Sequence, residues 1–146
     1  MSIEMYEFYK YMKILVADGV SPKGIEILQK AGFETVIKDK LPAEELLEII
    51  PDFDGLIVRS ASKVTKEVIE RAKKLKIVGR AGVGTDNIDI NAATAHGIMV
   101  INSPGGNTIA ATEHTMGMMM AMARNIAVAN ETMQHGEWNR KKYTGV

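Results

Sequence analysis

Gly-Leu-Ile-Val-Arg-Ser, residues 55–60, is the stretch of sequence that decides the fold. Its first four residues carry no polar side chain, as expected of a central strand that is buried on both faces of a parallel sheet. Short apolar runs of the same kind recur on both sides of it, and amphipathic stretches separate them, which is typical of βα units. The expected strands are Lys13–Ala17, Glu34–Ile37, Gly55–Val58, Lys76–Gly79 and Ile98–Ile101.

Helix signals fall between these runs. Ser21 is a good N-cap, Pro22 suits the first helical position, and Gly32 ends the helix that they begin. Thr65 caps a later helix, and a short helix is expected from about Asp89 to Ala95. The sequence therefore predicts a flavodoxin-like fold, which is a doubly wound parallel five-stranded sheet, with strand order 2-1-3-4-5.

The chain changes character after the fifth strand. Residues 102–107 are rich in turn formers, and Thr108 to about His135 reads as one uninterrupted helix, about 40 Å long at 1.5 Å per residue. Residues 116–123 are apolar on every side of that helix, so it needs a cover, and we expect a homo-oligomer formed through it. At the other end of the chain, residues 1–11 read as an N-terminal extension with no assigned function.

Composition narrows the classes of function. Eighteen basic residues balance eighteen acidic ones, which gives no reason to expect a nucleic-acid partner. The longest apolar run, Met116–Ala123, is far shorter than the roughly 20 residues of a membrane-spanning helix. The absence of cysteine excludes disulfides and thiolate metal sites and is consistent with a cytoplasmic protein. We therefore expect a soluble protein with no metal site.

Polar residues gather where the expected strands end. Arg59 and Ser60 follow the third strand, residues 80–85 (Arg-Ala-Gly-Val-Gly-Thr) follow the fourth, and residues 103–108 (Ser-Pro-Gly-Gly-Asn-Thr) follow the fifth. Glycine lets the backbone approach a ligand, and a guanidinium matches a carboxylate or phosphate. The pattern predicts a site for a small acidic ligand. It is not a dinucleotide fingerprint, because the third glycine is missing.

Each of these residues also has a structural interpretation. Arg59 could be a solvated surface residue. Arg80 could pair with Asp86, and Asn107 could cap the long helix, which does not exclude a ligand contact. The histidines lack a catalytic partner or a metal-binding spacing and are interpreted as structural; they are His96, His114 and His135.

Several motifs, in order, resemble those of the D-2-hydroxyacid dehydrogenase family. They are Val-Arg-Ser at residues 58–60, residues 79–89, residues 102–108, Glu-His-Thr at residues 113–115, residues 123–126 and residues 136–141. The resemblance runs from about Met12 to Val146. It implies a substrate-binding domain over residues 12–101, followed over 102–146 by the hinge, long helix and loop that lead to a separate NAD-binding domain.

The resemblance also implies a reaction and a set of contacts. It is closest to the phosphoglycerate-oxidising members, which implies NAD as cofactor and 3-phosphoglycerate as substrate. By position, Arg59 and Ser60 would contact the acidic substrate, the backbone of Val83 and Gly84 would bind its carboxylate, and Asn107 would add a further contact. The family's catalytic residues and NAD-binding loop match nothing in this chain, so we expect no catalytic or cofactor-binding residue and no activity from it alone. The alternative functions are a glyoxylate or hydroxypyruvate reductase and a non-catalytic domain that self-associates.

Overall fold

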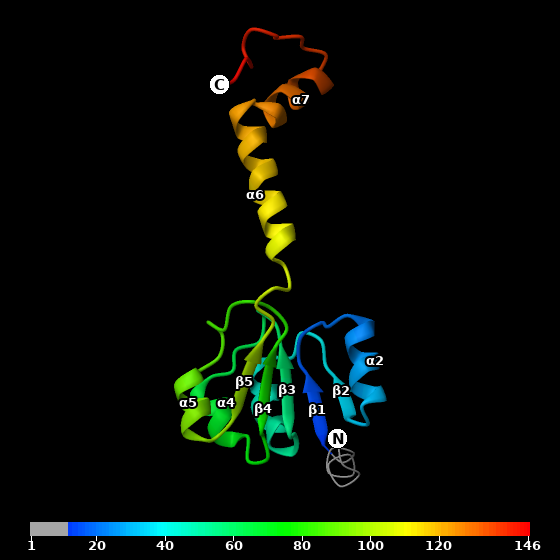
Figure 1. The fold of residues 1–146 in the computed structure, drawn as a ribbon, viewed down its shortest axis with the longest axis vertical. Coiled ribbons are helices and arrows are strands. Elements are labelled where there is room, and N and C mark those ends of the chain that lie inside the picture. The colour runs from blue at the N-terminus through cyan, green and yellow to red at the C-terminus, as the bar shows by residue number, and fades with distance from the viewer. Residues whose placement is uncertain (1–11) are drawn as a thin grey trace. The chain divides into compact units, whose positions relative to one another are not determined.

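A computed structural model describes residues 12–146, so the expected extension at residues 1–11 lies outside the described part of the chain. The chain divides into two compact units, one that ends at Gly106 and one that comprises Asn107–Val146. The limits of a substrate-binding domain at residues 12 and 101 stay a prediction. Figure 1 shows the sheet and its helices in the first unit, and the second unit is helical.

The first unit contains a parallel five-stranded sheet in the order β2-β1-β3-β4-β5, which confirms the predicted fold and strand order. The fourth and fifth strands each begin and end one residue later than predicted, and the first strand ends one residue earlier. The strands are β1 Lys13–Val16, β2 Glu34–Ile37, β3 Gly55–Val58, β4 Ile77–Arg80 and β5 Met99–Asn102. Because all strands are parallel, their carboxyl ends lie at one edge of the sheet.

Three helices of this unit begin at the predicted residue or one residue from it. The Ser21 hydroxyl accepts a hydrogen bond from the Gly24 amide and caps the first helix, and the Thr65 hydroxyl caps another in the same way. The Asp89 carboxylate caps the short helix before the last strand. The helices are α2 Pro22–Lys30, α3 Ala43–Ile49, the 3-10 turn η1 Ile50–Asp52, α4 Lys66–Arg71 and α5 Ile90–Ala95.

The core lies between one face of the sheet and α3, α4 and α5. Leu15, Leu56 and Val78 occupy neighbouring positions on β1, β3 and β4 and are at most 1% exposed. Leu46 of α3 and Ile69 of α4 pack in the same cluster. Burial of these side chains is the main favourable term for the fold, at roughly 1.5–3 kcal/mol each.

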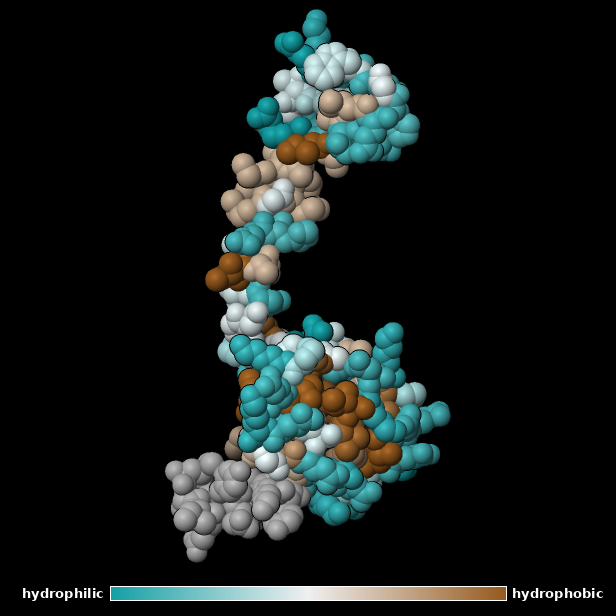
Figure 2. Space-filling view, turned by 90° about the vertical axis from the view of Figure 1, so that its right-hand side faces the viewer, coloured by the Kyte–Doolittle hydropathy of each residue, from teal (hydrophilic) through white to brown (hydrophobic). Residues whose placement is uncertain are grey.

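The other face of the sheet is only partly covered, because within residues 12–146 α2 is the one helix on that side. Figure 1 shows α2 across the sheet from α4 and α5. Ile27 of α2 and Ile101 of β5 remain 60% and 49% exposed, and an apolar groove of about 300 Å³ runs between α2 and the strands. Figure 2, which views the molecule from the side of α2, shows brown apolar surface on this unit.

The second unit contains two helices, α6 Thr108–Ala123 and α7 Ile126–Gln134, so the prediction of one helix from Thr108 to His135 is wrong. The break falls at Asn125, whose φ of 52° and ψ of 31° are left-handed helical values. Asparagine visits this conformation more readily than most residues. No residue of α6 or α7 is buried, and the methionines of α6 are at least half exposed. No helix of the described residues is long and apolar enough to span a membrane.

Candidate functional site

The carboxyl edge of the sheet is formed by three loops that the sequence singled out and by the end of β1. Arg59 and Ser60 follow β3 directly, and both are exposed. The loop after β4 and the loop after β5 are tied together, since the Ser103 amide donates to the Gly82 carbonyl at 2.9 Å and the Asn102 side chain donates to the Val83 carbonyl at 2.7 Å. The structure therefore holds the glycine loop in a fixed shape.

The backbone of Val83 and Gly84 offers unused donors. Neither amide hydrogen-bonds to an acceptor within residues 12–146, whereas the Val83 carbonyl is already paired with Asn102. Both residues are exposed, so water or a ligand can reach their amides. Two free N–H groups on a bent, glycine-containing loop are a suitable binding surface for a carboxylate.

Arg80, the last residue of β4, does not form the ion pair with Asp86 that was one interpretation of the sequence. No carboxylate within residues 12–146 lies in ion-pair distance of its guanidinium. Its Nε is buried without a hydrogen bond in the same part of the chain, and Nη1 lies against Gly82, 2.1 Å from where a Cβ atom would stand there. Arg80 thus adds an uncompensated positive charge beside the glycine loop.

Arg59 follows the end of β3, and within residues 12–146 its side chain makes one weak hydrogen bond, from Nη1 to the Gly19 carbonyl at 3.4 Å. The Ser60 hydroxyl makes no hydrogen bond within residues 12–146. A guanidinium and a hydroxyl that are free to turn toward solvent are able to bind an acidic ligand.

Asp18 and Ser62 belong to this edge and were not singled out by the sequence. Asp18 is 4% exposed and accepts hydrogen bonds from the Arg59 amide, the Ser62 amide and the Ser62 hydroxyl. Burial by itself raises the pKa of the Asp18 carboxyl, but the hydrogen bonds from Ser62 and from the amides of residues 59, 61 and 62 outweigh it, so the pKa lies below its usual value. A carboxylate at the end of the apolar run of residues 14–17 was the available signal.

The remaining predicted residues are placed elsewhere. Asn107 belongs to the second unit, where it is the N-cap residue of α6 but makes no side-chain capping bond. Its proximity to Arg59 and Ser60 stays a prediction. His96 and His135 each bond through Nδ1 to a carbonyl of their own helix, which agrees with a structural role. Within the described residues, no group of histidine, aspartate and glutamate side chains could hold a metal ion.

The fold and this edge define a class of protein. Residues 14–142 match the family model of the D-isomer specific 2-hydroxyacid dehydrogenase catalytic domain, and the chain belongs to that family. Among relatives, it is 50% identical over 135 residues to the D-3-phosphoglycerate dehydrogenase of Archaeoglobus fulgidus and 49% identical over 138 residues to that of Homo sapiens. These alignments cover 92% and 94% of this chain but 26% of each relative, so the chain spans about a quarter of their length.

Solved structures agree with the family. A crystal structure of a Thermus thermophilus protein superposes with a TM-score of 0.83 at 30% identity and covers 92% of this chain and 45% of that one. The NAD⁺-bound 3-phosphoglycerate dehydrogenase of Entamoeba histolytica superposes with a TM-score of 0.70 at 41% identity, over 78% of this chain and 40% of that one.

Proposed function

We propose that this chain is the substrate-binding part of an NAD-dependent D-3-phosphoglycerate dehydrogenase, a cytoplasmic enzyme that oxidises 3-phosphoglycerate to 3-phosphohydroxypyruvate. The observation that carries the proposal is the group of available donors at the carboxyl edge: two arginines that form no ion pair within residues 12–146, a serine hydroxyl and two backbone amides. Ligands of open parallel sheets bind at this edge. The identity of about half of all residues to D-3-phosphoglycerate dehydrogenases supports this choice of substrate.

Each group has a role in binding a doubly acidic molecule. The free amides of Val83 and Gly84 bind the carboxylate, because a carboxylate accepts from two parallel donors. The Arg59 guanidinium and the Ser60 hydroxyl contact the acidic substrate, and the exposed Asn107 stays a predicted further contact. Such charge-assisted hydrogen bonds are worth about 1.5–3 kcal/mol each.

The cofactor is assigned to another part of the enzyme. The Gly82-Val83-Gly84 loop does not fit a dinucleotide, because it lacks the third glycine and the helix that follows it, α5, has only six residues. No catalytic acid, base or nucleophile is assigned to this chain. We therefore expect neither NADH binding nor turnover from the chain alone, since hydride transfer needs a nicotinamide held against the substrate.

We also propose that the chain forms homo-oligomers through α6. Met118, Met119, Met120 and Met122 are between 52% and 75% exposed on a helix without a buried residue. Methionine adapts its shape to a partner surface, and two-fold pairing is the commonest arrangement of identical chains. A second copy of α6 is the simplest cover for these side chains.

The proposal is tested by titrating the ¹⁵N-labelled chain with 3-phosphoglycerate and, separately, with NADH, at low ionic strength. We expect amide shifts at Ser60, Val83 and Gly84 with 3-phosphoglycerate, a dissociation constant in the millimolar range, and no shifts with NADH. Arg59→Ala should weaken binding about tenfold. The control is Arg71→Ala, on the last turn of α4, whose guanidinium pairs with Glu67. Equal affinities for wild type and Arg59→Ala would remove Arg59 from the site.

A further inference from the structure

The bend that carries Arg59 and Ser60, residues 59–62, is held from two directions by residues that follow other strands. On one side, Asp18 accepts from the Arg59 amide at 2.6 Å, the Ser62 amide at 3.1 Å and the Ser62 hydroxyl at 2.8 Å. On the other side, Asn87 Nδ2 donates to the carbonyls of Arg59 and Ser62, both at 2.7 Å. The two ends of the bend are therefore each fixed through N–H and through C=O.

The Asp18 side of this arrangement is strong. Hydrogen bonds to an ionised carboxylate are shorter than neutral ones and about twice as strong. The carboxylate is almost fully buried, so water does not compete for it. Loss of its charge would leave the two amide donors of the bend with a poorer acceptor in a site closed to solvent.

The Asn87 side is itself rigid. The Asn87 carbonyl accepts from the Val64 amide at 2.8 Å, and Val64 forms a parallel bridge with Ile88. The side-chain Oδ1 of Asn87 is buried without a partner in residues 12–146. The Asn87 side chain donates both of its hydrogen bonds to the bend, and its oxygen stays unsatisfied, which costs stability. The orientation of this amide therefore serves to hold the bend.

We propose that Asp18 and Asn87 are positioning residues that hold the 59–62 bend in the conformation in which Arg59 and Ser60 bind the acidic substrate. The inference rests on the proposed function of that edge. Neither residue touches the substrate. Their effect on affinity passes through the backbone of the bend, which they fix before the substrate arrives, so that its ordering is not a cost of binding.

The negative charge of Asp18 separates a positioning role from a direct electrostatic effect on affinity, because the two predict opposite changes. Asp18 is an anion close to a site for anions, so its removal would strengthen binding if it acted only through space. A positioning role predicts the opposite, because Asp18→Asn releases the bend. We expect the dissociation constant for 3-phosphoglycerate to rise at least tenfold, equivalent to about 1.4 kcal/mol.

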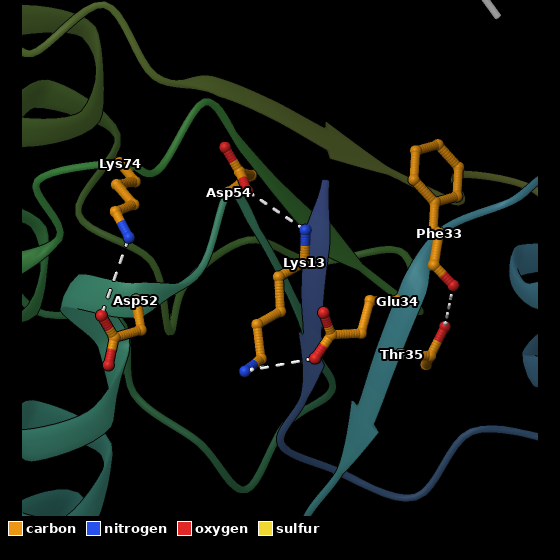
Figure 3. Close-up of polar contacts among 7 residues, drawn as sticks. All are labelled: Lys13, Phe33, Glu34, Thr35, Asp52, Asp54 and Lys74. Atoms are coloured by element: carbon orange, nitrogen blue, oxygen red, sulfur yellow. Dashed lines mark hydrogen bonds and ion pairs between the residues drawn. The ribbon is translucent and has the colours of Figure 1, made fainter. Parts of the chain in front are cut away.

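A matched carboxylate lies at the opposite edge of the sheet. Asp54, just before β3, accepts from the Lys13 amide at 3.1 Å and pairs with Lys76 at 3.3 Å, and its side chain is 18% exposed. Figure 3 shows Asp54 beside Lys13, among the polar contacts at the amino end of the strands. Asp54→Asn should lower stability, as Asp18→Asn does, but leave the affinity for 3-phosphoglycerate unchanged.

The experiment measures amide shifts of the labelled 146-residue chain during titration with 3-phosphoglycerate, for wild type, Asp18→Asn, Asn87→Ser and Asp54→Asn. Thermal unfolding of each variant is followed by circular dichroism, so that affinity is compared well below the melting temperature. Asn87→Ser leaves the charge of the chain unchanged, and serine is too short to reach the carbonyls of both Arg59 and Ser62. We expect this variant to weaken binding at least about fivefold. Ser62→Ala, which removes one hydrogen bond to Asp18, replaces Asp18→Asn if that variant does not fold.

A double-mutant cycle with Arg59→Ala completes the test. If Asp18 acts through Arg59 and Ser60, then Asp18→Asn should weaken binding less in the Arg59→Ala background than in wild type. If wild type shows shifts at residues 59 and 60 but Asp18→Asn and Asn87→Ser bind as tightly as wild type or more tightly, the positioning role is overturned and the proposed function stands. Absence of wild-type shifts at these residues would overturn the proposed function and the positioning role with it.

Discussion

Gly82→Ala tests whether the Arg80 guanidinium takes part in anion binding. A Cβ atom at residue 82 would lie 2.1 Å from Arg80 Nη1 and 2.9 Å from Arg80 Cζ. Non-bonded heavy atoms need about 3.5 Å, so the guanidinium must move by more than about 1 Å. The Arg80 Nε makes no hydrogen bond within residues 12–146, so no hydrogen bond of Nε to these residues opposes the movement.

The expected effects of Gly82→Ala on affinity and on stability differ widely. Loss of a charge-assisted hydrogen bond of about 1.5–3 kcal/mol weakens binding of 3-phosphoglycerate roughly 10- to 150-fold. The free energy of unfolding should change by less than about 1 kcal/mol, because two effects offset each other. Alanine lowers the conformational entropy of the unfolded chain, which stabilises the fold, and displacement of the flexible Arg80 side chain destabilises it by a similar amount. The assays are an NMR titration and urea unfolding at the same pH.

Gly79→Ala is the control for this substitution. Its Cβ would meet Ile57 Cγ1 at 3.7 Å and Ile101 Cγ1 at 3.9 Å, which are ordinary contacts on the partly covered face of the sheet. We expect neither affinity nor stability to fall. If Gly82→Ala binds 3-phosphoglycerate as tightly as Gly79→Ala does, then Arg80 is not a ligand-binding residue and the reasoning from its unpaired charge is refuted.

Two further predictions concern acid stability and assembly. The folded-state pKa of Asp18 is lowered, so its contribution is fully present above the unfolded pKa of about 3.9 and is lost as pH falls through the folded value. The free energy of unfolding from urea titrations should therefore fall more steeply below about pH 4 in wild type than in Asp18→Asn, and parallel pH profiles would contradict this. Met120→Glu should shift sedimentation toward monomer and leave the far-ultraviolet dichroism of the sheet unchanged, because a carboxylate is costly to bury between two copies of α6. A wild-type monomer at high micromolar concentration would exclude the interface.

The fold could be predicted because its local signals agree with its tertiary structure. Ser21 and Thr65 cap the helices that they were predicted to cap, and the apolar run at residues 55–58 is a central strand. Strand ends shifted by one residue, which is the usual uncertainty of such boundaries. The loop residues that follow β3, β4 and β5 were predicted from the strand ends alone, because parallel strands all finish at the carboxyl edge.

The features that the sequence did not predict depend on contacts distant in the chain or on a single torsion. Asp18 bonds to residues 41 and 44 positions away, and no periodicity encodes that pairing. The break before α7 depends on one left-handed φ at Asn125, in a segment whose apolar pattern continues across it and which contains no proline. Arg80 was left open between pairing with Asp86 and binding a ligand, and a choice between them needed the distance between two flexible side chains.

The absence of any buried residue in α6 and α7 has a thermodynamic consequence. The heat capacity increase on unfolding comes from the hydration of apolar groups that folding had removed from water. Helices whose side chains are already hydrated contribute little to that increase, and their melting is governed by the helix–coil balance of short segments, which is broad in temperature. In an isolated chain, the sharp heat absorption therefore belongs to the sheet unit, and its enthalpy divided by all 146 residues falls below the value usual for globular proteins. Association through α6 would restore part of the difference and make the melting temperature rise with concentration.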